Sequence, residues 1–191
     1  MYQKYQTDAL VLKSRESGEA DRSIYLYTRD FGLVNSRCRA VRTEKSKMRY
    51  ALQNYSRARV GLIRGRQNWR IAGAIALESS HGRDANATAA FARIAELVTR
   101  LVAGEEANAY LFEVLSEAHG SLMQENCSAW ATIELVCVAR VLYSLGYISA
   151  EALQTALFTH TSYADTHLKE AEELRNELLL SINQAISETH L

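Results

Sequence analysis

The spacing of apolar residues changes once along this chain, and the change limits the folds available to it. Up to residue 79, short segments alternate apolar and polar side chains, which is the pattern of half-buried strands. From residue 87 onwards, apolar residues recur every three to four positions, which is the pattern of amphipathic helices. A chain with strands first and helices second is predicted to be an α+β protein in which the two kinds of element are segregated.

Five strands are predicted in the first part, separated by turns that contain Gly, Asn, Asp or Ser. They cover residues 7–13, 22–28, 33–41, 56–63 and 69–77. In the fifth strand Trp69, Ile71, Ile75 and Leu77 are predicted to share one face. Five short strands at this spacing are typical of a small barrel or sandwich, and a five-stranded OB-type barrel is the natural candidate. Residues 1–79 are therefore predicted to form an N-terminal OB-fold barrel.

An all-helical second domain is predicted over residues 80–191. Its helices cover residues 87–102, 107–123, 128–145 and 164–186, with a short helix starting near Ser149. The helix over 128–145 is apolar nearly all round, so we expect it to be central and buried. Gly146 lies where a helix C-cap is expected.

Charge divides the chain at the same place. Residues 1–79 contain 16 lysines and arginines against 7 aspartates and glutamates, whereas residues 80–191 contain 6 against 15. The whole chain therefore has a formal net charge of zero. An excess of nine positive charges in one small domain indicates a polyanionic partner, of which nucleic acid is the most common.

The basic residues are concentrated in and after the third predicted strand. Arg37 and Arg39 alternate with smaller residues, so a strand would place both on one face, about 7 Å apart, close to the phosphate spacing of a nucleic acid. Arg57 and Arg59 form a second same-face pair. The predicted DNA-binding residues are Arg37, Arg39, Arg42, Lys45, Lys47, Arg49, Arg57 and Arg59, the middle four in a predicted loop. Arginine is suited to this contact because its planar fork pairs with phosphate and stacks on bases.

Tyrosines lie among these cations, at positions 25, 27, 50 and 55. Cations along the backbone combined with aromatic faces for the bases are the mixture that single-strand binding uses. Two other interpretations stay open. The arginines could form a solvated face with no ligand, and the protein could be an interaction adaptor whose basic barrel docks on another protein or on its own acidic helical domain.

Motifs for catalysis are absent from the sequence: there is no Walker loop, no GxSxG and no HExxH. We therefore expect no enzyme activity, no cofactor and no metal.

The acidic residues near the first hairpin are interpreted as turn and capping residues; they are Asp8, Glu16, Glu19, Asp21 and Asp30. The histidines are scattered, at positions 81, 119, 160, 167 and 190. Cys38, Cys127 and Cys137 form no CxxC pair, so buried thiols in a reducing cytosol are expected. Neither a signal peptide nor a membrane-spanning run is expected.

Several segments resemble the bacterial DNA repair protein RecO family. The family's first hairpin carries a Gly-Glu-Ala-Asp-Arg turn and a Thr-Arg-x-x-Gly strand end, matched here by residues 18–22 and by Thr28, Arg29 and Gly32. A basic loop and a Leu-Gln-x-aromatic entry follow, matched by Leu52, Gln53 and Tyr55. Residues 101–115, and residues 139–147 with their Leu-Gly-Tyr end, are similar to the family's helical domain.

The resemblance implies a function as well as a fold. It implies an OB barrel plus a helical domain, in a recombination mediator without catalytic turnover, which is cytoplasmic and associated with the nucleoid. Such proteins bind single- and double-stranded DNA, anneal complementary strands, contact the single-strand DNA-binding protein and, with RecR, assist RecA loading. Many members carry a four-cysteine zinc site after the Leu-Gly-Tyr helix. No cysteine follows Tyr147 here, and His160 and His167 have no cysteine partners, so no zinc is expected.

Overall fold

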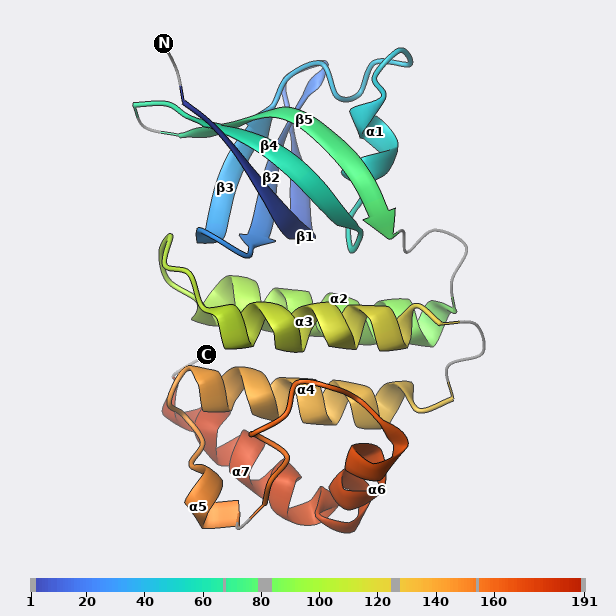
Figure 1. Cartoon of the computed structure of the whole chain (residues 1–191), viewed down its shortest axis with the longest axis vertical. Coiled ribbons are helices and arrows are strands. Elements are labelled where there is room, and N and C mark those ends of the chain that lie inside the picture. Colours follow the sequence, from blue (N-terminus) through green and yellow to red (C-terminus); the bar gives the residue numbers. More distant parts are fainter. Residues whose placement is uncertain (1–2, 67, 79–83, 125–127, 154, 190–191) are drawn as a thin grey trace. The chain divides into compact units, whose positions relative to one another are not determined.

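The first part of the chain folds into a closed five-stranded barrel (Figure 1). The structure is a computed structural model, which describes residues 3–66, 68–78, 84–124, 128–153 and 155–189. The barrel strands are β1 (Lys4–Ser17), β2 (Asp21–Thr28), β3 (Gly32–Cys38), β4 (Arg57–Arg64) and β5 (Trp69–Glu78). A short helix, α1 (Met48–Ala51), comes between β3 and β4.

The strand order is that of an OB-fold. The order around the barrel is β1-β2-β3-β5-β4, and β1 closes the ring because it pairs antiparallel with both β2 and β4. Only the β3–β5 pairing is parallel among the described strands. A register shift between Val11 and Lys13 lets the long β1 bend between its two neighbours. The predicted α+β fold, with a five-stranded OB-fold barrel followed by helices, is confirmed.

The barrel core follows the alternation that the sequence shows. Ile24 and Leu26 of β2, Val34 of β3, and Val60 and Leu62 of β4 are all fully buried. The fifth strand departs from its prediction. Trp69 and Ile71 point inward, but a register shift between Gly61 and Leu62 of β4 adds one residue to β5, so that Ile75 pairs with the outward-facing Arg59 and is 70% exposed. The prediction of one shared face for all four residues is therefore wrong, because a bulge exchanges the two faces of a strand.

The turn between β2 and β3 requires a glycine at its end. Gly32, at the start of β3, has a φ of +62°, and a Cβ there would lie 2.1 Å from the carbonyl oxygen of Glu106. Both the left-handed backbone and the close approach exclude a side chain. The predicted turn before β3 therefore has a physical need for glycine at this position.

The second part of the chain is helical. Its elements are α2 (Ala85–Leu101), α3 (Ala109–Leu122), α4 (Trp130–Ser144), α5 (Ala150–Leu153), α6 (Asp165–Glu173) and α7 (Arg175–Glu188). As predicted, α4 is a buried helix, and Gly146 follows it with a φ of +82°. The single final helix predicted over 164–186 is wrong. Leu174, with φ −92° and ψ 10°, separates α6 from α7, and each of these helices packs on α4.

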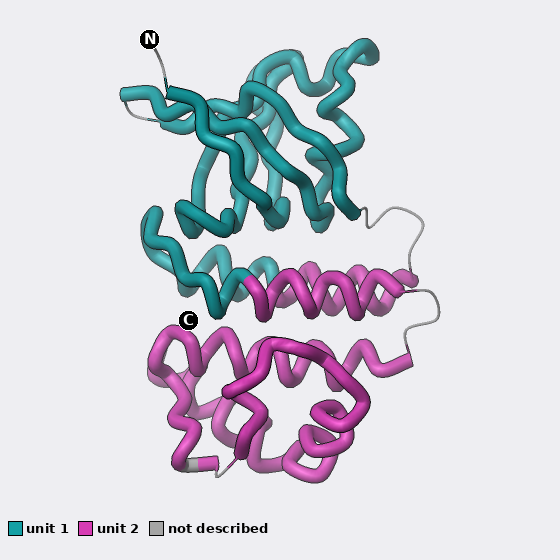
Figure 2. Tube along the Cα trace, in the orientation of Figure 1, with its two compact units in different colours: residues 1–82, 95–112 teal, residues 83–94, 113–191 magenta. Residues whose placement is uncertain are grey.

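The chain forms two compact units, which do not correspond to a single cut in the sequence (Figure 2). The first comprises residues 1–82 and 95–112, and the second comprises residues 83–94 and 113–191. The boundary between the units therefore runs through α2 and α3. The predicted domain boundary after residue 79 lies in the segment 79–83, outside the described residues. In the described part of the chain, no helix is both long enough and apolar enough to span a bilayer.

Candidate nucleic-acid interface

The outer face of β1, β2, β3 and β5 carries a row of polar and basic residues. Asn35 and Arg37 of β3 are exposed, as their alternation with buried neighbours predicts. Strand pairing places Ser23 between Arg15 and Arg37, and Arg37 beside Arg70. Directly opposed side chains in a sheet have Cβ atoms about 5 Å apart. The row therefore presents three arginines across four strands, on the β2–β3 face with which OB-folds bind oligonucleotides.

A second row lies beside the first. Lys13 of β1 opposes Tyr25 of β2, which opposes Asn35 of β3. The Ser23 hydroxyl donates to Asn35 Oδ1 at 2.8 Å and so links the two rows. Lys13 and Arg15 were missed as site residues because β1 was expected to end at Lys13, whereas it continues to Ser17. In the sequence, the alternation of basic Lys13 and Arg15 with the smaller Ser14 was a signal that could have extended the strand.

Arg39 does not lie where it was predicted. β3 ends at Cys38, three residues earlier than expected, because Ala40 adopts a positive φ of 52° and starts a turn. Asp21 holds this turn: its Oδ1 accepts the Ala40 N–H at 2.9 Å, and its Oδ2 accepts Arg37 Nε at 3.0 Å. The Ala40 N–H, and then Arg37, keep the pKa of Asp21 below its usual value. Arg37 and Arg39 are therefore not a same-face strand pair.

The loop after β3 is fastened to the β1–β2 turn by Arg42. Its guanidinium lies 3.1 Å from Glu16 Oε1 and donates to the Gly18 carbonyl at 3.3 Å, while its N–H donates to the Ala20 carbonyl. Arg42 therefore positions the loop. Arg39, Lys45 and Lys47 are exposed and make no hydrogen bond or ion pair within the described parts of the chain. Arg49 is not in a loop as predicted but in α1.

Arg57 and Arg59 share the outer face of β4, as predicted, but each faces a carboxylate. Arg59 forms a bidentate pair with Asp8, Nε to Oδ1 at 2.7 Å and Nη2 to Oδ2 at 3.3 Å. This pair keeps the pKa of Asp8 below its usual value despite partial burial of the carboxyl group. Arg57 Nη1 lies 3.7 Å from Glu78 Oε1, and its Nε is buried without a hydrogen-bond partner.

The predicted cations therefore fall into two sets. Four arginines are paired with carboxylates of the barrel itself, namely Arg37, Arg42, Arg57 and Arg59. Lys45, Lys47 and Arg49 have no carboxylate partner among the described residues, and Lys13 and Arg15 share this property. Arg39 forms no ion pair there either, but its charge contributes to lowering the pKa of Asp21. The acidic residues near the first hairpin thus have a role beyond turns and caps, since Asp8, Glu16 and Asp21 are ion-pair partners.

The remaining titratable groups predicted from sequence do not gather into a site. Cys38 and Cys137 are buried free thiols, and burial raises the pKa of Cys38 to about 11. His119 is buried against Phe91, and the rings of His160 and His167 stack with centroids 5.0 Å apart. Cys127, His81 and His190 lie outside the described residues. Within the described ranges, no three His, Cys, Asp or Glu side chains are grouped to hold a metal ion.

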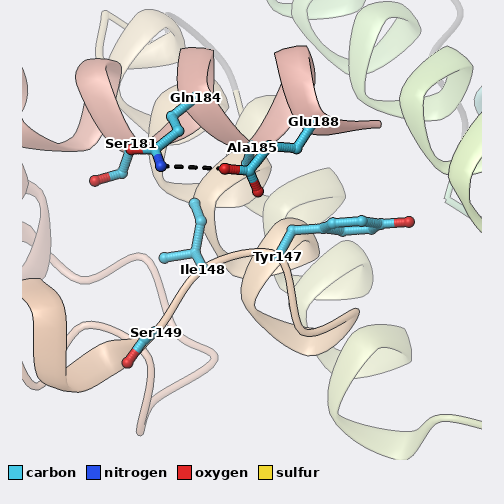
Figure 3. Close-up of a pocket in the computed structure, with 7 residues that line it drawn as sticks. All are labelled: Tyr147, Ile148, Ser149, Ser181, Gln184, Ala185 and Glu188. Carbon is cyan, nitrogen blue, oxygen red and sulfur yellow. Dashed lines mark hydrogen bonds between the residues drawn. The ribbon is translucent and has the colours of Figure 1, made fainter. Parts of the chain in front are cut away.

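The second unit contains a pocket whose lining residues are distant in sequence from the basic residues and include no lysine or arginine. Its volume is about 160 Å³, and it lies between the segment after α4 and helix α7 (Figure 3). On the α7 side of the pocket, Gln184 donates to Glu188 of the next turn at 3.1 Å. Its lining residues are Tyr147, Ile148, Ser149, Ser181, Gln184, Ala185 and Glu188. Because no cation lines it, we do not include this pocket in the candidate nucleic-acid interface.

Comparison with known proteins gives one family. Residues 1–78 match the family described as "Recombination protein O N terminal". The chain is similar to proteins named DNA repair protein RecO. It is 31% identical to that of Gloeothece citriformis over 119 residues, covering 61% of this chain and 42% of the relative. It is 26% identical to that of Dehalococcoides mccartyi strain 195 over 168 residues, covering 78% and 66%. The match to the Pelotomaculum thermopropionicum protein is 38% identical over 63 residues, covering 33% of this chain and 25% of the relative. The matched region thus spans less than half of the first and third relatives.

Proposed function

We propose that this chain, which belongs to the RecO family, binds DNA through the outer face of β1, β2 and β3 and through the loop 39–49. The observation that carries the proposal is the set of cations without carboxylate partners on and beside the β2–β3 face of an OB-fold. Lys13 and Arg15 lie on the strands, and Lys45 and Lys47 lie in the loop that Arg42 fastens beside them. This surface has the charge and the fold to follow a phosphate backbone.

The proposed mechanism is electrostatic capture without chemistry. Each phosphate that a lysine or arginine neutralises releases condensed counterions, which favours binding to single and double strands alike. Neutralised phosphates repel one another less, so two complementary strands held by such proteins can approach and anneal. The protein would then act in DNA repair and recombination as a mediator with no enzymatic turnover, no cofactor and no metal.

The proposed partners follow from family membership. They are single- and double-stranded DNA, RecR and the single-strand DNA-binding protein, with RecA loading assisted indirectly on coated DNA. The proposed location is the cytoplasm, in association with the nucleoid. The two exposed paired arginines, Arg37 and Arg59, suit exchange between partners, because an exposed ion pair contributes only about 0–1 kcal/mol and a phosphate can replace its carboxylate.

Fluorescence anisotropy across a salt series tests DNA binding. Labelled single-stranded and duplex DNA should bind at low salt and dissociate as salt rises, with a log–log slope of roughly −0.7 per phosphate contact for single strands. The double variant Arg37→Glu, Arg39→Glu should bind more weakly and with a flatter slope. A matched control is Lys169→Glu, Arg175→Glu, which removes the same charge from α6 and α7 and should retain wild-type binding.

Two outcomes would contradict the proposal. Absence of binding at low salt would favour the adaptor interpretation, in which the barrel binds a protein. Equal losses in the two double variants would mean that net charge alone, and not this face of the barrel, determines affinity.

A further inference from the structure

One of the four tyrosines near the basic residues is set apart by its exposure. Tyr27 is fully buried, with its ring stacked on Phe112, and Tyr25 and Tyr55 are half-buried. Tyr50, in α1, is 62% exposed. The two residues that follow it, Ala51 and Leu52, are buried in or beside the barrel core, so the helix is anchored while the ring remains in solvent. A large exposed ring on an anchored helix is available for contact with a ligand.

Arg49 holds this ring in place. Its guanidinium carbon lies 5.0 Å from the centroid of the Tyr50 ring, and its Nη2 donates to the Tyr50 hydroxyl at 2.9 Å. A cation above a ring is attracted to the negative face of the aromatic system. The ring is therefore oriented without being buried, and its exposure shows that it retains open surface. Orientation before binding lowers the conformational entropy lost when a ligand stacks on it.

The surroundings of the ring suit a nucleic-acid backbone. Lys47 is the residue before α1, and Lys45 precedes it in the loop; both are exposed and have no partner among the described residues. Arg42 ties this loop to the β1–β2 turn. An aromatic face flanked by free cations is the combination that binds single strands, with phosphates on the cations and a base on the ring.

We propose that Tyr50 stacks on an unpaired nucleobase, and that this contact gives the barrel a preference for single-stranded over duplex DNA. The inference rests on the proposed DNA binding and deepens it by naming the base as a second point of recognition. Bases within a duplex are already stacked on both faces and cannot reach the ring without being unpaired, whereas a single strand offers them freely. The cations bind both forms of DNA, and Tyr50 distinguishes between them.

The test compares three labelled probes of equal length by anisotropy: oligo(dT), an abasic single strand and a duplex. The abasic strand keeps the phosphates but has no bases. Tyr50→Ala should weaken oligo(dT) binding about tenfold while leaving the abasic strand and the duplex within about twofold. Tyr50→Leu, which keeps apolar bulk but not a flat ring, should behave like Tyr50→Ala. Tyr50→Phe should retain most of the affinity. Tyr147→Ala, at an exposed tyrosine of the second unit, should leave all three unchanged.

The outcomes separate this inference from the proposed function. If the wild-type protein binds none of the probes, both are overturned. If it binds but Tyr50→Ala retains its affinity for oligo(dT), or loses affinity equally for all three probes, stacking is overturned and DNA binding stands. Selective loss for oligo(dT) in Tyr50→Ala and Tyr50→Leu, with retention in Tyr50→Phe, supports stacking. Unchanged thermal unfolding of the variants would show that the loss does not come from misfolding.

Discussion

Two exposed arginines of the barrel and one buried arginine of the second unit are held in opposite ways. In the barrel, Arg37 and Arg59 lie on the surface, each more than half exposed, and each is paired with a carboxylate. In the second unit, Arg140 of α4 is completely buried and has no carboxylate partner among the described residues. The exposed pairs can exchange a carboxylate for water or phosphate at small cost, whereas the buried guanidinium is fixed in place.

Backbone carbonyls, and not a carboxylate, accept hydrogen bonds from Nε and Nη1 of Arg140, while its Nη2 is buried without a hydrogen-bond partner. Its Nε donates to the Leu157 carbonyl at 2.9 Å, and its Nη1 donates to the carbonyls of Thr161 and Ser162 at 3.0 Å. The guanidinium carbon also lies 4.8 Å from the centroid of the Tyr163 ring. These carbonyls belong to the connection between α5 and α6, which contains no helix or strand over residues 155–164. Arg140 therefore organises a loop, whereas Arg37 and Arg59 of the barrel lie at the surface, where a ligand can reach them.

Removing the buried guanidinium should have the largest effect. Arg140→Met keeps the length of the side chain but leaves three carbonyls without a donor, so the free energy of unfolding should fall by about 3 kcal/mol. Arg140→Lys should recover only part of this, because an ammonium group lacks the planar fork. Urea unfolding followed by circular dichroism measures both. Arg175→Met, at an exposed arginine paired with Glu172, is the control and should cost below about 0.5 kcal/mol. Equal costs for Arg140→Met and Arg175→Met would remove the distinction between buried and exposed arginines.

Within the barrel, the free and the paired cations should differ in their contribution to DNA affinity. Lys45→Gln with Lys47→Gln removes two charges that have no partner, and should lower affinity about tenfold near 0.1 M salt and flatten the salt slope by about 1.4 for single strands. Arg57→Gln with Arg59→Gln removes two charges that Glu78 and Asp8 partly offset, and should cost about threefold. Anisotropy with one labelled single strand measures both variants. Equal losses would mean that the internal ion pairs do not restrict the arginines.

The barrel could be predicted because its signal is local. Burial alternates along β3, over residues 24–26 of β2 and over residues 57–60 of β4 as the sequence alternates, and the change to helical spacing marks the second part. The errors occur where the backbone departs from regular geometry. The positive φ of Ala40 ends β3 before Arg39, a bulge turns Ile75 outward, and the backbone at Leu174 divides the last helix. Neither Ala40 nor Leu174 is a glycine or proline, the residues that usually mark an interruption, whereas the bulge lies beside the paired Gly61 and Gly73.

The ionic partners could not be predicted because they are set by tertiary structure. Asp8 and Arg59 are 51 residues apart and meet only because β1 pairs with β4. Counting charges gave the correct sign for the domain but could not separate cations with a carboxylate partner from those without one. For the same reason, the sequence could not rank the four tyrosines as candidates for base stacking. The structure separates them, because Tyr27 is buried and Tyr50 is exposed.

The smallest expected change in DNA affinity comes from Asp8→Asn, which tests whether the Asp8 carboxylate keeps Arg59 from binding DNA. Asp8→Asn removes the charge that holds Arg59, so affinity for single-stranded DNA should rise about two- to threefold at low salt. Glu177→Gln is the matched control, because it removes an equal charge from an exposed residue of α7 that has no ion-pair partner in the described part of the chain and lies outside the proposed DNA-binding surface. If both variants raise affinity equally, the gain reflects net charge and not release of Arg59.

The free energy of unfolding should depend on pH through Asp8, and Asp8→Asn tests this. The pKa of Asp8 is lowered in the folded protein, so the carboxylate stabilises the fold above the usual pKa of 3.8, and this stabilisation is lost as the pH falls through the lower folded value. Because the partner is an exposed arginine, Asp8→Asn should reduce the free energy of unfolding at pH 7 by less than about 1 kcal/mol. The difference between the two proteins should vanish under acid conditions, where Asp8 is protonated in both states. Urea unfolding at a series of pH values measures it, and a difference that persists at low pH would mean that shape or hydrogen bonding at Asp8, and not its charge, stabilises the barrel.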